Sequence, residues 1–137
     1  SAVHMKAMME AAKAGADPRL RAMFTAMWGE SLAVPEEADV FALMDQAAAL
    51  PENQRPRVYC TCGLQEAEGG GILLQNHALR DYAANLSLDY VYEEWDGVHE
   101  WNFWDRSLAQ FIGFIQNSDY GRRKRADWSA AIACVNI

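Results

Sequence analysis

The organisation of this chain depends most on one segment, Tyr90-Val-Tyr-Glu-Glu-Trp-Asp-Gly-Val-His-Glu-Trp-Asn-Phe-Trp-Asp105. Its first residues alternate as in a strand, Gly97 allows a tight turn, and the aromatic residues after the turn begin a helix. A strand ending in such a turn leaves His99 at the carboxyl edge of a sheet, where α/β folds place their chemistry. Taken alone, these residues leave two interpretations open: His99 is a functional imidazole, or it packs among the neighbouring tryptophans.

Composition and charge limit the class of protein. The 137 residues are 51% hydrophobic and 23% charged, which predicts one domain with a real core. A net charge of −7 argues against binding to nucleic acid or to an anionic membrane. The basic run Arg122-Arg-Lys-Arg125 is too short to change this, and we interpret it as a solvated linker after the last helix.

Cysteine and histidine spacing gives no sign of a disulfide framework or a metal site. Cys60, Cys62 and Cys134 are odd in number, and C-x-C is not a redox motif, so we expect reduced thiols in a cytoplasmic protein. The three histidines are far apart in sequence, and we expect no metal and no cofactor. No apolar run is long enough to span a membrane, and the first residues do not resemble a signal peptide.

Residue periodicity predicts an alternation of helices and strands. Strands are expected at residues 57–62 and 88–93, and helices at residues 5–14, 19–28, 35–50, 73–86 and 104–115. The strand, helix and strand from residue 57 onward form the right-handed crossover of a parallel sheet. Two parallel strands are too few for a self-sufficient sheet, so the chain is expected to be part of something larger.

Several motifs then match one family in order and spacing. The most specific are Gly97-Val-His-Glu-Trp101 with Trp104-Asp105, and Val58-Tyr-Cys-Thr-Cys-Gly63; Met27-Trp-Gly-Glu30 and Ala38-Asp-Val-Phe-Ala-Leu43 give weaker support. On these residues the chain, from about Ser1 to about Gln116, resembles the C-terminal half of esterases of the α/β-hydrolase superfamily. The group includes tributyrin esterases, S-formylglutathione hydrolases and acetyl or feruloyl esterases. The resemblance implies a partial α/β-hydrolase fold over residues 1–120, followed by a basic linker and an extra C-terminal tail over residues 121–137.

The resemblance also implies roles for site residues. His99 falls where the family keeps its general base. The family's acid lies in a C-G-T-E-D pattern, and the corresponding residues here are Cys62-Gly-Leu-Gln-Glu66, so Glu66 takes the acid position. Glutamate reaches one methylene further than aspartate, and the following loop with Gly69-Gly-Gly71 is longer than in the family. Glu66 is therefore either the working acid or a solvent-facing residue of a remodelled loop, with Asp96 as the nearest substitute.

The nucleophile expected of this family is missing from the chain. There is no G-x-S-x-G, and the family places both this serine and its oxyanion-hole loop upstream of the region matched here. Gly29-Glu-Ser-Leu-Ala33 looks similar, but it follows a predicted helix, whereas a nucleophile elbow follows a strand. Ser31 is therefore not taken as the nucleophile.

Two functions of different classes follow from this reading. In the first, the chain is the C-terminal portion of a serine carboxylesterase for short-chain or aryl esters, whether a fragment or one piece of a split enzyme. It supplies His99 and the acid, and the ester substrate binds once the N-terminal half is present. In the second, the chain is a non-catalytic esterase remnant that oligomerises or binds a partner, with the strand-like residues 126–137 pairing between subunits.

Overall fold

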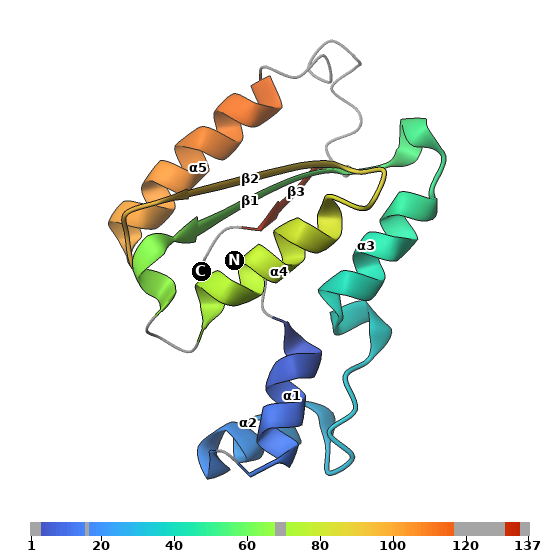
Figure 1. Ribbon diagram of the computed structural model, residues 1–137, viewed down its shortest axis with the longest axis vertical. Helices are drawn as coiled ribbons and strands as arrows, with labels where there is room; N and C mark the ends of the chain where they lie inside the picture. Colours follow the sequence, from blue (N-terminus) through green and yellow to red (C-terminus); the bar gives the residue numbers. More distant parts are fainter. Residues whose placement is uncertain (1–3, 16, 68–70, 117–130, 135–137) are drawn as a thin grey trace.

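A computed structural model describes residues 4–15, 17–67, 71–116 and 131–134 of the chain. Figure 1 shows a small sheet with helices on both faces, and two further helices, α1 (Met5–Lys13) and α2 (Pro18–Trp28), at one end of the molecule. This arrangement is a mixed α/β structure. None of the helices in the described residues combines the length and apolar character needed to cross a bilayer.

The sheet has three parallel strands in the order β2, β1, β3. The central strand β1 (Arg57–Gly63) pairs along its whole length with β2 (Asp89–Trp95). On its other side it pairs through Arg57 to Cys60 with β3 (Ala131–Cys134). The sequence predicted the first two strands, and pairing of the tail between subunits belonged to the second of the two functions considered. The described part of the tail, residues 131–134, is a strand that pairs within its own chain.

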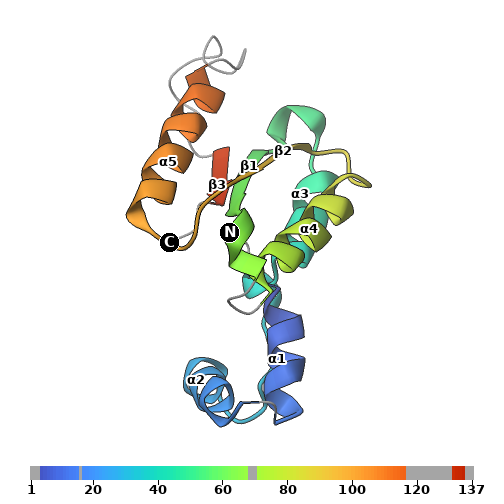
Figure 2. The same ribbon diagram turned by 60° about the vertical axis from the view of Figure 1, so that its left-hand side comes forward.

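Each face of the sheet is covered by different helices. Figure 2 shows α5 (Trp101–Gln116) on one face, and α3 (Val40–Ala49) with α4 (Ile72–Ala83) on the other. Toward α5, the Tyr59 ring lies 5.3 Å from that of Phe114, and the Thr61 hydroxyl donates to Ser107 Oγ at 3.1 Å. On the opposite face, Met44, Leu79 and Ala83 form a buried cluster. Tyr59 and Thr61, which are two positions apart on β1, thus both face α5, as the alternation of side chains along a strand requires.

The segment 35–50 differs from its predicted single helix. A short 3₁₀ turn, η1 (Glu36–Ala38), comes first, and α3 begins only after Asp39. The Asp39 side chain accepts a hydrogen bond from the Phe41 N–H at 3.2 Å and forms an ion pair with Lys6 of α1. Asp39 is thus the N-cap of α3, because its carboxylate satisfies a free N–H of the first turn. Burial alone would raise the pKa of Asp39, but Lys6 and the backbone N–H groups lower it.

Helices α1 and α2 share a small core of their own. Met9, Ala12, Phe24 and Leu32 are buried together, with other N-terminal methionines packed against them. The methionines of α1 are therefore core residues in the folded chain, whereas Met23 and Met27 of α2 are exposed. One direct link to the rest of the molecule is the His4 N–H, which donates to Gln75 Oε1 at 2.8 Å.

Candidate active site

Two loops leave neighbouring parallel strands at the same edge of the sheet. Strand β1 ends at Gly63 and continues into a 3₁₀ turn, η3 (Leu64–Ala67), which carries Glu66. Strand β2 ends at Trp95 and continues into a turn that carries His99 before α5 begins. Gly63 and Trp95 are register partners, so the two loops start side by side. The topology therefore brings the predicted base and acid to one place.

The two side chains lie within ion-pair distance. His99 Nδ1 is 3.4 Å from Glu66 Oε1. This is longer than a charge-assisted hydrogen bond, which is about 2.7–2.9 Å, and catalytic hydrogen bonds commonly tighten only when substrate is bound. Glu66 is buried, with 6% of its side chain exposed, whereas the His99 side chain is 46% exposed. A buried carboxylate thus faces an imidazole that solvent or a substrate can reach.

The imidazole also packs against one tryptophan. The rings of His99 and Trp104 meet edge to face, with centroids 5.2 Å apart and planes at 88°. Trp101 packs against the same indole with centroids 4.9 Å apart. The two interpretations of His99 are therefore compatible, because its ring packs against Trp104 while its Nδ1 faces Glu66.

Gln65 fastens the two loops to each other. Its backbone N–H donates to the Gly97 carbonyl at 3.3 Å, and its Oε1 accepts from the Gly97 N–H. Its Nε2 donates to Asp96 Oδ1 at 3.2 Å. Asp96, the alternative acid, is thus engaged by Gln65, whereas Glu66 is the carboxylate beside His99. In the sequence, Gln65 stood out only because the resemblance leads one to expect glutamate at this position. Its position directly before Glu66 was the one sign that it could help to place the acid.

Two glycines of these loops leave no room for a Cβ atom. A Cβ at Gly63 would lie 2.2 Å from the Gly97 carbonyl oxygen, which is backbone and has little freedom to move. A Cβ at Gly97, where φ is +159°, would lie 2.5 Å from Phe103 Cδ2. A side chain at Gly63 would therefore push the two loops apart, whereas a side chain at Gly97 would displace the Phe103 ring of α5.

Other reactive side chains do not join this pair. Ser31 lies in an exposed turn between α2 and η1, so it does not stand on a strand-to-helix elbow. Cys62 is fully buried, and burial raises the pKa of its thiol to about 11, which makes it a poor nucleophile near neutral pH.

The remaining histidines have separate partners. His77 Nε2 lies 2.7 Å from Glu94 Oε2, and this contact lowers the pKa of Glu94. The His4 ring lies 4.4 Å from that of Phe41. Among the residues that the structure describes, no three histidine, cysteine or acidic side chains are grouped so that they could hold a metal ion.

In chemical terms, the pair can hold and transfer a proton. A carboxylate at Nδ1 orients an imidazole and stabilises its protonated form, so that Nε2 exchanges the proton with a reacting group. Acyl transfer additionally needs a nucleophile and donors for an oxyanion.

Comparison with known proteins gives one partial similarity. The chain is 33% identical over 54 residues to an acetyl esterase from Caldicellulosiruptor saccharolyticus. The match covers 39% of this chain and only 19% of that esterase, so the chain corresponds to about a fifth of the length of its relative. No family model matches the chain, and no solved structure matches it. The comparisons thus establish a limited similarity to part of an esterase.

Proposed function

We propose that this chain is the C-terminal part of a serine carboxylesterase with the α/β-hydrolase fold, acting on short-chain or aryl esters. The observation that carries the proposal is the pair of His99 and Glu66, 3.4 Å apart on loops that follow two adjacent parallel strands. The partial similarity to an acetyl esterase supports carboxylic esters as the substrate class.

The roles of the pair follow from its chemistry. His99 takes the proton of a serine hydroxyl through Nε2 while the serine oxygen attacks the ester carbonyl. It returns the proton to the departing alcohol, and it then activates the water that releases the acid from the acyl-enzyme. Glu66 stabilises the imidazolium in both steps. In this proposal the serine and the oxyanion donors come from outside the chain, from an upstream half or a complementing chain.

The surface around the pair supports contact with another part of the enzyme. Leu64, Val98 and Trp101 flank the two loops and have exposed fractions of 39%, 43% and 76%. Apolar side chains with this exposure gain free energy when another surface or an acyl group covers them.

A chimera tests the proposal directly. Residues 57–116 of this chain would replace the corresponding C-terminal segment of the Caldicellulosiruptor acetyl esterase, and hydrolysis of p-nitrophenyl acetate would be followed. The 137-residue chain alone should give no hydrolysis above background, whereas the chimera should be active. Glu66→Gln in the chimera should lower kcat by on the order of 10⁴-fold, as expected when the orienting acid of a triad is neutralised.

Asp96→Asn is the matched control for the identity of the acid. It also neutralises one carboxylate, but it keeps the Oδ1 acceptor for Gln65 and should leave kcat nearly unchanged. A larger loss from Asp96→Asn than from Glu66→Gln would assign the acid to Asp96. Activity of the isolated chain that disappears in Ser31→Ala would refute the proposal. A folded but inactive chimera would favour the alternative of a non-catalytic binding or oligomerising module.

A further inference from the structure

Strand β2 lies at one edge of the sheet. It pairs with β1 on one side, and within the described residues no strand pairs with its other side. An edge strand presents unpaired backbone N–H and C=O groups that another extended chain can use. Binding of such a chain also requires space for its side chains on both faces of the sheet.

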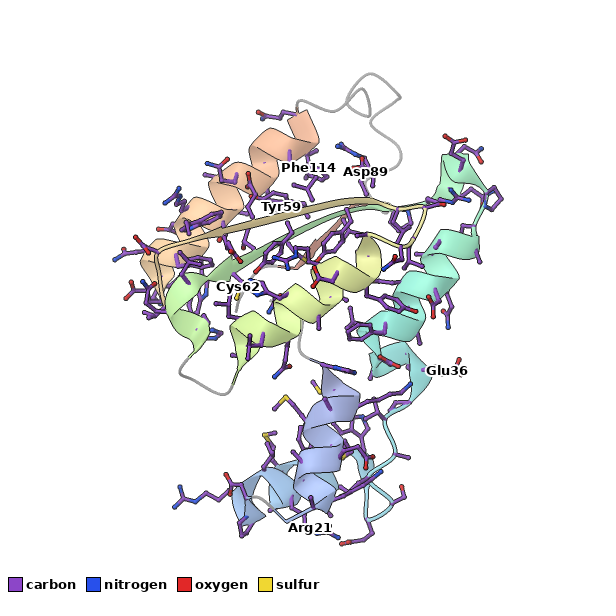
Figure 3. All side chains as sticks on the ribbon, viewed as in Figure 1. Arg21, Glu36, Tyr59, Cys62, Asp89 and Phe114 are labelled. Carbon is purple, nitrogen blue, oxygen red and sulfur yellow. The ribbon has the colours of Figure 1, made fainter. Side chains whose placement is uncertain are left out.

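A groove lies beside β2 on the face covered by α5. Its volume is about 280 Å³, and its walls include Val91 and Glu93 of β2, Tyr59 of β1, and Phe114 of α5. Figure 3 labels Tyr59 and Phe114 between the sheet and α5, with Asp89 at the same end of the sheet. Gly113 of α5 also lines the groove, and a Cβ there would meet nothing within 4 Å. Packing therefore does not require this glycine, and its lack of a side chain leaves the groove open.

A second groove lies beside β2 on the opposite face. Its volume is about 320 Å³, and its walls include Tyr90 and Tyr92 of β2 and Leu88 just before the strand. On the α4 side, the small residues Ala83 and Ala84 line it. Arg80 also lines it, with its guanidinium carbon 5.7 Å from the centre of the Tyr92 ring, so the groove is aliphatic and aromatic around one cation.

The two grooves together match the geometry of strand addition. Alternate residues of β2 line opposite grooves: Val91 and Glu93 line one, and Tyr90 and Tyr92 line the other. A strand that pairs with the free edge would send its own side chains alternately to the same two faces. We propose that β2 binds an extended segment of a partner protein as an additional strand, with one set of its side chains in each groove.

The lining of each groove defines the partner's chemistry. The groove beside α5 offers the Glu93 carboxylate, which accepts a hydrogen bond from the Tyr59 hydroxyl and keeps further acceptor positions. The one arginine of this groove, Arg57, is already paired with Asp89 and lies 4.1 Å over the ring of Phe114. Carboxylate and aromatic faces suit lysine or arginine, and the apolar groove beside α4 suits valine or leucine. The partner segment thus alternates basic and aliphatic residues.

Self-pairing fits this surface poorly. A second copy of β2 would bring Asp89, Glu93 and Glu94 to an edge that carries the same three acids, in a chain of net charge −7. A basic segment instead meets these acids with opposite charge, and Glu93 is the one of them that has no cationic partner among the ion pairs of the described residues, since Asp89 pairs with Arg57 and Glu94 with His77.

The experiment uses the 137-residue chain and the peptide acetyl-(Val-Lys)₄-amide, with binding followed by calorimetry at low ionic strength. The block peptide acetyl-Val₄-Lys₄-amide has the same composition and charge and should bind at least about tenfold more weakly, because its basic and aliphatic side chains cannot alternate. Two alternately N-methylated peptides, methylated at all Val or at all Lys, test the backbone pairing. One should lose binding by about tenfold or more, and the other should keep it, since only alternate N–H groups face β2.

Variants locate the site on the protein. Gly113→Phe fills the groove beside α5, Ala84→Phe fills the groove beside α4, and each should weaken binding at least about tenfold. Ala109→Phe is the control, because Ala109 is an exposed residue of α5 that is in the lining of neither groove. Unfolding midpoints by circular dichroism identify any variant that fails to fold, and the two grooves provide independent tests. Equal binding of alternating and block peptides, or of both N-methylated peptides, would overturn the proposal. So would a sedimentation measurement showing a dimer that Gly113→Phe dissociates, because the occupant would then be a second copy.

Discussion

Replacing Gly63 by alanine tests the contact between the two loops of the candidate site. The new Cβ would lie 2.2 Å from the carbonyl oxygen of Gly97 and 2.8 Å from its carbon. An ordinary contact between carbon and oxygen is about 3.3–3.6 Å, so the loops must separate by about 1 Å. Because both contacting atoms belong to backbone, rotation of a side chain cannot relieve the clash.

The expected loss of stability has two parts. Overpacking in a closed environment costs about 1–3 kcal/mol. Separation of the loops also breaks the two hydrogen bonds between Gln65 and Gly97, each worth about 1 kcal/mol. We therefore expect Gly63→Ala to lower the free energy of unfolding by about 3–5 kcal/mol.

Urea unfolding followed by tryptophan fluorescence measures this loss. With a slope of about 1.5 kcal/mol per molar urea, a loss of 3 kcal/mol moves the midpoint down by about 2 M. Gly113→Ala is the matched control, because a Cβ there meets nothing and alanine is the better helix former; it should stabilise by about 1 kcal/mol. A loss below about 0.5 kcal/mol in Gly63→Ala would refute the close approach of the loops.

Two further predictions concern groups away from the loops. Ser107→Ala removes the acceptor of the buried Thr61 hydroxyl and should lower the free energy of unfolding by about 1–3 kcal/mol. The double variant Thr61→Val, Ser107→Ala should recover much of this stability, because neither polar group is then left without its partner. Additive losses of the two single variants in urea unfolding would contradict the pairing. The hydrogen bond with His77 lowers the pKa of Glu94 in the folded chain below its ordinary value of 4.5. The contact therefore stabilises the fold fully above pH 4.5, and this stabilisation is lost as the pH falls through the lowered pKa of Glu94. Stability measured between pH 5 and pH 3 should therefore fall less steeply in Glu94→Gln than in the wild-type chain, and parallel curves would rule this out.

The central layer of the fold was predictable because its signals are local. The run Arg57 to Cys62 is short, apolar and bounded by proline and glycine, and it forms the buried strand β1. The following helix and strand also formed where their periodicity placed them, as α4 and β2. Strand, helix and strand in this order leave one favoured arrangement, the parallel crossover.

Features that depend on distant partners were predicted less well. Residues 131–134 have strand-forming composition, but whether they pair within one chain or between two depends on β1, which lies some 70 residues earlier. The start of α3 was placed too early because Pro35 and two glutamates give a strong start signal. Asp39 overrides it, since its carboxylate caps the helix and pairs with Lys6 from another helix.

In the candidate site, the identities of the residues follow from local motifs, whereas the distance between them depends on contacts between the two loops. His99 and Glu66 were identified from motifs, but their separation depends on how closely Gly63 approaches Gly97 and on the hydrogen bonds of Gln65. The same contacts bear on the proposed role of Glu66, whose side chain is one methylene longer than the aspartate that the resemblance leads one to expect. The Glu66 side chain begins on a 3₁₀ turn directly after β1, and its Oε1 comes within 3.4 Å of Nδ1 of an imidazole that packs against Trp104. The additional methylene is thus accommodated by the backbone geometry of the two loops, which is why changes at Gly63 should disturb the pair without touching either of its members.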